Sequence, residues 1–279
     1  MEIIKFIQGF SNPFLDKFFS IITNLGGQSL GIFLSILFIW CIDKKFGYRF
    51  LYGILFSFNL NNIIKGFVNS KRPIGIEGIR SLQVHTATGS SFPSGHSQGN
   101  ATTITLLLDQ FRYKWLFVLG FFMFILIPLS RLYLGVHWPI DVILGSIIGI
   151  ISAFISNKIF NLSNLYGRKI LVFSLFFYLI LALIVPNDDL FKALGALSAF
   201  IIGILIEEKY INYNPKTSFM KNIIKFLIGM LGALIIYLLF SLLPKSIYVS
   251  YIKYFCLCFW AIVLAPLLFI KLNLAKKYV

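Results

Sequence analysis

The sequence predicts an all-α integral membrane protein, a polytopic transmembrane helical bundle of about nine spans with an N-terminal interfacial amphipathic helix. Composition is the first observation behind this prediction. Hydrophobic residues make up 58% of the 279-residue chain and charged residues 13%, against roughly 45–50% and about 25% in soluble domains. The second observation is a mean hydropathy of +0.86. A soluble core cannot bury so much apolar surface, so soluble globular, collagen-like and disordered classes are excluded.

The first 24 residues predict an amphipathic segment that lies in the membrane interface. Polar residues interrupt the apolar ones, and no small-residue cleavage site follows, so a cleavable signal peptide is not expected. The sequence Ser11-Asn12-Pro13 combines a cap with a proline in the first turn, which predicts the start of a second short helix. One helical stripe of apolar residues favours an interfacial position; it comprises Ile3, Ile7, Phe10, Phe14, Phe18, Ile21 and Ile22.

Apolar stretches long enough to suggest membrane spans follow along the rest of the chain. A spanning helix needs about 20 apolar residues. The stretches cover residues 25–42, 50–64, 97–108, 115–129, 139–159, 170–185, 190–206, 223–243 and 252–270. The stretch 97–108 is the shortest and is polar in its first half, so it requires protein rather than lipid around that half; a re-entrant hairpin is the alternative.

The net charge of +15 is explained by topology rather than by a nucleic-acid partner. Lysine and arginine concentrate in alternate loops, which the positive-inside rule assigns to the cytoplasm. The N-terminus, the loop 66–92, the corner 130–139 and the turn 187–189 then lie on the outer face. We therefore expect a plasma (inner) membrane protein in contact with membrane lipids and not with nucleic acid. The frequent Ile, Lys, Asn and Phe residues indicate a bacterial source. Three parts are expected: the interfacial segment 1–24, a core at 25–160, and four additional helices of unknown role at 161–279.

Charged and polar residues gather at four predicted helix ends on that outer face, where such residues indicate a functional site. Ser94 and Gly95 open a helix, whose free backbone N–H groups and dipole favour an anion. His137 and Asp141 are four residues apart and share a helical face. The predicted site comprises Lys65, Arg72, Ser94, Gly95, His96, Arg131, His137 and Asp141.

This combination of three cations, two imidazoles and one carboxylate suits phosphoryl transfer. The arginines can bind phosphate with bidentate hydrogen bonds, and Lys65 adds a point charge. Asp141 would hold the His137 tautomer, so that the free ring nitrogen attacks phosphorus and forms a phosphohistidine. His96 would protonate the leaving oxygen and then activate water. Two-metal phosphatases need several clustered acidic ligands, which the outer face lacks, so neither a metal nor another cofactor is expected.

Three motifs carry a family resemblance: Lys65-x6-Arg72-Pro73, Pro93-Ser94-Gly95-His96 and Ser130-Arg131-x5-His137-x3-Asp141. Their order and internal spacing resemble the three signature motifs of the type 2 phosphatidic acid phosphatase superfamily. The resemblance covers residues 20 to 160. It implies His137 as nucleophile, Asp141 as its partner and His96 as acid/base. It also implies phosphate binding by Lys65, Arg72, Ser94, Gly95 and Arg131.

The expected function is a membrane phosphatase that removes phosphate from an amphiphilic phosphomonoester or isoprenyl pyrophosphate in the bilayer, on the extracytoplasmic side. Phosphatidate, undecaprenyl pyrophosphate and lipid A phosphate are all plausible substrates. Three alternatives remain open: a phosphotransferase on the same core, a soluble sugar-phosphate phosphatase, and an anion-binding transporter or scaffold. Two loop cations, Lys71 and Arg80, are expected to be solvated, and His85 is expected to be an exposed histidine without a role.

Overall fold

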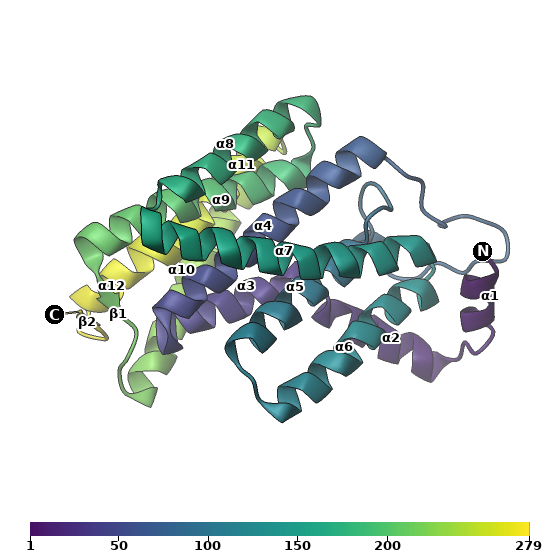
Figure 1. Ribbon diagram of the computed structural model, residues 1–279, viewed down its shortest axis with the longest axis horizontal. Helices are drawn as coiled ribbons and strands as arrows, with labels where there is room; N and C mark the ends of the chain where they lie inside the picture. The colour runs from purple at the N-terminus through teal and green to yellow at the C-terminus, as the bar shows by residue number, and fades with distance from the viewer. Residues whose placement is uncertain (279) are drawn as a thin grey trace. The chain divides into compact units, whose positions relative to one another are not determined.

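The computed structural model describes residues 1–278, which form two units that divide within shared helices. The first unit comprises Met1–Gly31 and Leu60–Ser156, and the second comprises Ile32–Asn59 and Asn157–Val279. Helices account for nearly all regular structure in both (Figure 1). The chain is therefore all-α, as the sequence predicts.

The first unit contains the N-terminal helices, the end of the helix Lys44–Val68 and the helices that follow the loop 66–92. It comprises α1 (Glu2–Gln8), α2 (Pro13–Leu25), the start of α3 (Gln28–Leu37), the end of α4 (Lys44–Val68), the short 3-10 helix η2 (Val84–Thr86), α5 (Gly95–Gln110), α6 (Lys114–Tyr133) and most of α7 (Pro139–Tyr166). Asn12 caps α2, where its Oδ1 accepts a hydrogen bond from the Leu15 amide at 2.9 Å. The predicted second short helix after Ser11-Asn12-Pro13 is confirmed.

The second unit contains the remaining helices and three π-helical turns. It comprises η1 (Phe38–Ile42), α8 (Lys169–Ile184), α9 (Asp188–Ile206), η3 (Glu207–Ile211), α10 (Phe219–Ser241), α11 (Ile247–Phe259), η4 (Trp260–Leu264) and α12 (Ala265–Lys271), with parts of α3, α4 and α7. A two-residue antiparallel ladder joins β1 (Tyr213–Asn214) to β2 (Lys276–Lys277).

Trp40 in η1 forms hydrogen bonds with three other segments of the second unit, namely η4, α10 and β1. Trp40 Nε1 donates to the carbonyl of Ala261 in η4 at 2.8 Å. The carbonyl of Trp40 accepts from the buried Lys225 Nζ at 2.7 Å and from the Tyr213 hydroxyl. These bonds satisfy polar groups inside an apolar unit, where an unpaired group is costly.

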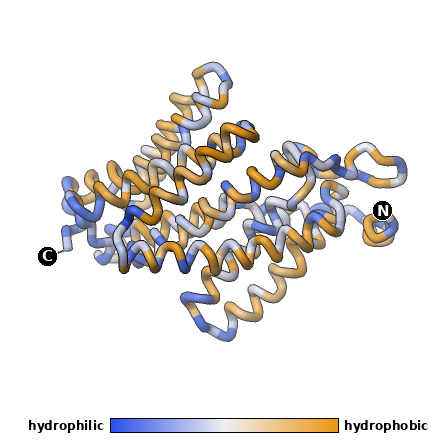
Figure 2. The backbone as a smooth tube through the Cα atoms, turned by 45° about the horizontal axis from the view of Figure 1, so that its top comes forward, coloured by the Kyte–Doolittle hydropathy of each residue, from blue (hydrophilic) through white to orange (hydrophobic). Residues whose placement is uncertain are grey.

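The prediction of nine spans is wrong for the described residues 1–278. Five helices there are long and apolar enough to cross a membrane: α6, α7, α9 with η3, α10, and α11 through α12. A sixth candidate is formed by α2 together with α3 and η1, which meet at a bend of 49°. Figure 2 shows apolar residues along these helices and hydrophilic residues gathered in the connections.

Three of the stretches predicted to span a membrane are not candidate spans in the structure, and each has a physical reason. The 16-residue helices α5 and α8 extend only about 24 Å at 1.5 Å per residue, short of a hydrocarbon core of about 30 Å. The helix α4 carries charges at both ends and the buried asparagines Asn59, Asn61 and Asn62. Protein surrounds those asparagines, so an apolar run in the sequence does not distinguish a core helix from a span. That α1 and α2 lie in the membrane interface stays a prediction.

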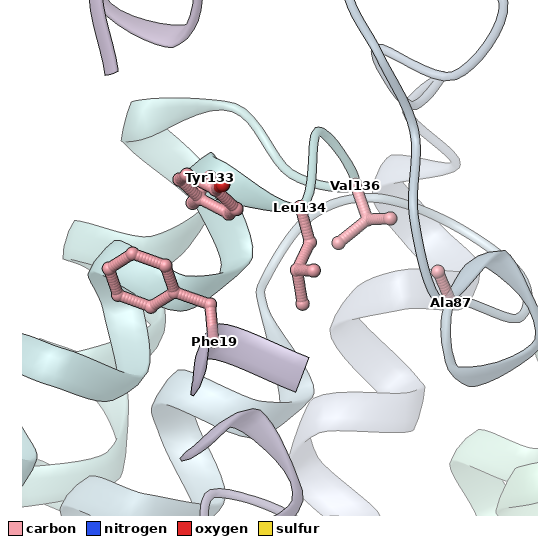
Figure 3. Close-up of a cluster of buried hydrophobic side chains, with 5 residues drawn as sticks. All are labelled: Phe19, Ala87, Tyr133, Leu134 and Val136. Atoms are coloured by element: carbon pink, nitrogen blue, oxygen red, sulfur yellow. The ribbon is translucent and has the colours of Figure 1, made fainter. Parts of the chain in front are cut away.

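A hydrophobic cluster joins α2, the loop 66–92 and the corner after α6. Phe19, Ala87, Tyr133, Leu134 and Val136 are its buried members (Figure 3). The rings of Phe19 and Tyr133 lie with their centroids 4.5 Å apart. The backbone reinforces this packing, because the Leu82 amide donates to the Leu134 carbonyl at 2.9 Å. The corner that carries the third motif is thereby held against two other segments of the first unit.

Candidate active site

All eight residues that the sequence singles out lie in the first unit, on helix ends and connecting loops. The first motif ends α4. Lys65 Nζ donates to the Ser90 carbonyl at 2.6 Å. Arg72, in the following loop, donates to the carbonyls of Gly89, Thr88, Ser90 and Val136 at 2.8–3.1 Å. Its guanidinium therefore links the loop 66–92 to the corner after α6.

The second motif begins α5 and is connected to the third through the backbone. The Ser94 hydroxyl caps the helix by accepting from the Ser97 amide. The Ser94 amide donates to the Asp141 carbonyl at 3.0 Å, so the first turns of α5 and α7 begin side by side. A Cβ on Gly145 in α7 would lie 2.9 Å from the Ser94 carbonyl oxygen, so a glycine is needed for this close approach.

His96, in the first turn of α5, is half-buried, and its imidazole makes no hydrogen bond with the described residues 1–278. Its imidazole lies close enough to Lys65, Arg72, Arg131 and His137 for their charges to act on it. A side chain this close to four charged or ionisable groups, with no hydrogen bond of its own, is available to a ligand of the site.

The third motif pairs His137 with Asp141, which are both 2% exposed. His137 Nδ1 lies 3.4 Å from Asp141 Oδ2. That oxygen also accepts from the Ser91 hydroxyl and from the Trp138 amide at 2.8 Å. The carboxylate is thus fixed by donors from two segments.

Arg72 determines which nitrogen of His137 carries the proton. Arg72 Nη1 lies 3.0 Å from His137 Nε2. A guanidinium only donates hydrogen bonds, so Nε2 acts as the acceptor and the proton of the neutral ring resides on Nδ1, facing Asp141. The lone pair of Nε2 therefore points away from the carboxylate and toward the cationic groups.

Arg131 is fully buried at the end of α6. Its Nη1 donates to the Thr23 hydroxyl at 2.8 Å, and both Nη atoms approach the Thr86 hydroxyl at 3.3 Å. Its Nε has no partner within residues 1–278. Neither Arg131 nor Arg72 forms an ion pair with a carboxylate in that part of the chain. Arg131 is buried and Arg72 is half-buried, and the charge of Asp141 acts on Arg72 without a direct ion pair. Cations neutralised this incompletely favour a bound anion.

Burial and positive neighbours change the ionisation of the loop residues of this site. Burial lowers the pKa of Arg72 to about 10, so the guanidinium remains protonated at neutral pH. Burial also lowers the pKa of His137, and the charges of Arg72, Arg131 and Lys65 act in the same direction, whereas the Asp141 carboxylate opposes them. The free site therefore holds a neutral His137 beside its cations. No cluster of three His, Cys, Asp or Glu side chains suited to a metal occurs among the described residues.

Several site residues were not found by sequence reasoning. Ser91, Thr23 and Thr86 each bond to a predicted site residue, but single hydroxyl residues outside a motif carry no signal in one sequence. Arg80 is exposed, as expected, and it also pairs with Asp16 at 2.6 Å. The predictions that Lys71 and His85 are exposed are confirmed.

Comparison with known proteins identifies the class. Residues 46–165 match the PAP2 superfamily, and residues 191–277 match the transmembrane extension of PAP2 superfamily phosphatases. The crystal structure of LpxE from Aquifex aeolicus shares 31% identity, with a TM-score of 0.50, over 56% of this chain and 93% of that one. The chain belongs to the PAP2 superfamily, also called the type 2 phosphatidic acid phosphatase superfamily, as its three motifs predict.

Two characterised relatives are similar to part of the chain. An undecaprenyl-diphosphatase from Sulfolobus acidocaldarius is 32% identical over 45% of this chain, and the match spans only 60% of that relative. A lipid A 4'-phosphatase from Bacteroides thetaiotaomicron is 27% identical over 53% of this chain and 71% of its own length. Each of these two matches therefore covers only about half of this chain.

Proposed function

We propose that this protein is a membrane phosphatase that hydrolyses a lipid phosphomonoester or an isoprenyl pyrophosphate through a phosphohistidine intermediate. The observation that carries the proposal is the pair of guanidinium groups of the buried Arg131 and the half-buried Arg72, which form no ion pair with a carboxylate within residues 1–278 and act on one oriented imidazole. A phosphate group supplies the missing counter-ion. The names of the two relatives, a diphosphatase and a lipid phosphatase, support the substrate class.

The first chemical step uses the lone pair of His137 Nε2. This nitrogen attacks phosphorus and forms the P–N bond while the bond from phosphorus to the leaving oxygen breaks. Binding of the anionic phosphate offsets the charges of Arg131, Lys65 and Arg72 that act on His96, so His96 takes up a proton and donates it to that oxygen. Arg72, Arg131 and Lys65 stabilise the charge that develops on the equatorial phosphoryl oxygens, with the amides at the start of α5. Asp141 stabilises the cationic ring that results.

The second step returns the site to its starting state. His96 removes a proton from water, the water oxygen attacks phosphorus, and the P–N bond breaks to release inorganic phosphate and neutral His137. Each proton moved in the first step is recovered in the second.

Charge distribution supports an extracytoplasmic position for the site. Lysine and arginine concentrate in the loops opposite to the site-bearing ends, which indicates a cytoplasmic side under the positive-inside rule. Intact spheroplasts given a water-soluble short-chain substrate analogue test this part. We expect phosphate release without lysis; release only after lysis contradicts the assignment.

Release of inorganic phosphate by detergent-purified protein, with EDTA present, tests the activity. Phosphatidate, undecaprenyl pyrophosphate, lipid A and glucose 6-phosphate are compared for the wild type, His137→Ala and His85→Ala. We expect turnover of a lipid substrate that His137→Ala abolishes and that His85→Ala leaves unchanged, because His85 is exposed and outside the motifs.

Other outcomes contradict the proposal in distinct ways. Hydrolysis of glucose 6-phosphate alone indicates a sugar-phosphate phosphatase. Phosphoryl transfer to an added acceptor hydroxyl, with little free phosphate in its absence, indicates a phosphotransferase. Binding of anions by a folded protein without turnover indicates a transporter or scaffold.

A further inference from the structure

Arg131 is oriented by two threonines that belong to neither its own helix nor the third motif. Thr23 lies in α2, 108 residues before Arg131, and its hydroxyl accepts from Nη1 at 2.8 Å. Thr86 lies in η2, and its hydroxyl accepts from both Nη atoms at 3.3 Å. These are all the hydrogen bonds that the Arg131 guanidinium makes with residues 1–278.

The direction of the Thr86 hydroxyl is fixed by a further bond. Its proton is donated to the Gln83 carbonyl at 2.8 Å, which leaves the oxygen lone pairs for Arg131. Hydroxyl groups are neutral, so they orient the guanidinium without cancelling its charge, as a carboxylate would. An arginine held this way keeps its attraction for an anion.

The two threonine-bearing segments are themselves tied together at the end of α6. Asp16 in α2 accepts two hydrogen bonds from Arg80 of the loop, at 2.8 and 2.6 Å, and one from the Tyr133 hydroxyl. Gln8 in α1 donates to the carbonyls of Arg80 and Tyr133 at 2.6 and 2.9 Å. Tyr133 is two residues from Arg131, so these hydrogen bonds link α2 and the loop to the helix end that carries the arginine.

We propose that Thr23 and Thr86 are positioning residues, which hold the Arg131 guanidinium in place to bind the phosphate group of the substrate. This inference rests on the proposed function and deepens it. The PAP2 match begins at residue 46, so Thr23 lies outside it. The N-terminal helix α2 thereby becomes part of the phosphate site instead of serving only as a membrane segment.

Inhibition by vanadate, an analogue of phosphate, tests this role in the full-length protein. Thr23→Val removes the hydroxyl and retains a similar shape. Loss of a hydrogen bond to a charged group predicts about a tenfold rise in the inhibition constant for vanadate and about a tenfold fall in kcat/KM, because Arg131 acts on the charge that develops in the transition state. Thr23→Ser restores the hydroxyl and is expected to return both constants toward wild type.

A matched control and a double variant separate positioning from a general packing defect. Thr103→Val alters another buried threonine of the first unit, on α5, and is expected to leave the vanadate constant unchanged. In an Arg131→Lys background, Thr23→Val should change the vanadate constant little further, because the guanidinium group that Thr23 orients is absent. Thr86→Val provides an independent second variant with the same expected rise.

The outcomes distinguish this inference from the proposed function. A wild type that hydrolyses lipid phosphate and binds vanadate, beside a Thr23→Val variant with an unchanged vanadate constant, overturns the positioning role alone. An equal effect of Thr23→Val with and without Arg131 also overturns it. A folded wild type that neither binds vanadate nor releases phosphate overturns both.

Discussion

Arg72 Nη1 lies 3.0 Å from His137 Nε2, the atom to which the phosphoryl group is proposed to be transferred. The same guanidinium nitrogen also donates to the Val136 carbonyl at 2.8 Å. In the free site, therefore, an arginine occupies the approach to the nucleophile. A phosphate must displace this contact, and the arginine is then already in position to bind the phosphate oxygens.

Arg72→Lys is expected to lower kcat/KM by about a hundredfold. A guanidinium reaches several carbonyls and Nε2 in one plane, whereas a lysine ammonium is a single compact charge, and two lost charge-assisted hydrogen bonds correspond to about this factor. Steady-state phosphate release measures the effect. Lys71→Ala is the matched control, since the Lys71 side chain is exposed and the substitution keeps the backbone carbonyl that accepts a hydrogen bond from Trp138 Nε1 at 2.9 Å. An Arg72→Lys variant as active as the Lys71→Ala control would contradict the role proposed for the planar guanidinium group of Arg72.

Asp141→Asn is expected to reduce kcat by about ten-thousandfold, by analogy with the aspartate of a hydrolytic triad. The amide keeps the shape of the carboxylate but loses the charge that stabilises cationic His137. Ser91→Ala removes one donor to the same oxygen, and about a tenfold loss is expected for one charge-assisted bond. Thermal unfolding in detergent serves as the control for folding. A larger loss of kcat in Ser91→Ala than in Asp141→Asn would contradict the assignment of Asp141 as the group that stabilises cationic His137.

The pH dependence of kcat/KM should show an acid limb below the ordinary histidine pKa of about 6.5. Burial and the charges of Arg72, Arg131 and Lys65 lower the pKa of His137, so the nucleophile stays neutral as the pH falls through 6. Removal of a positive neighbour favours the protonated ring and raises its pKa. Lys65→Gln should therefore move the acid limb to higher pH in its residual activity. A limb that moves to lower pH in this variant would be inconsistent with the electrostatic account.

Glu207→Gln is expected to destabilise the second unit by about 3–5 kcal/mol, because it leaves the buried ammonium of Lys44 without a counter-charge. Lys44 Nζ lies 2.8 Å from Glu207 Oε1, with side-chain exposures of 6% and 0%. The same oxygen accepts from the Tyr213 amide at 2.7 Å. Thermal unfolding in detergent measures the change.

The adjacent carboxylate offers the control for this ion pair. Glu208 pairs with Arg168 and is 39% exposed, so Glu208→Gln should cost about 0–1 kcal/mol. Lys44→Met combined with Glu207→Gln should recover part of the loss, because no unpaired charge remains. Equal destabilisation by the two glutamine variants would mean that burial of the pair has no consequence for stability.

The predicted residues of the site meet in one unit because their motifs mark helix ends. Ser94 and Pro139 begin α5 and α7, and Arg131 lies in the last turn of α6. Caps, prolines and i,i+4 spacing are local properties, so they are readable from neighbouring residues. The number of membrane spans could not be predicted from local spacing. The asparagines of α4 and the short helix α5 count against a span only once the structure shows which protein segments surround them.

The sequence by itself determined the membrane class, the all-α architecture, the superfamily and the types of residue at the site, because composition and short-range spacing carry these properties. Only the tertiary structure decided which partners orient those residues. Thr23 reaches Arg131 across 108 residues, and Ser91 reaches Asp141 across 50. Such bonds depend on how helices pack over long separations, and a lone hydroxyl residue leaves no trace of that packing in the sequence around it.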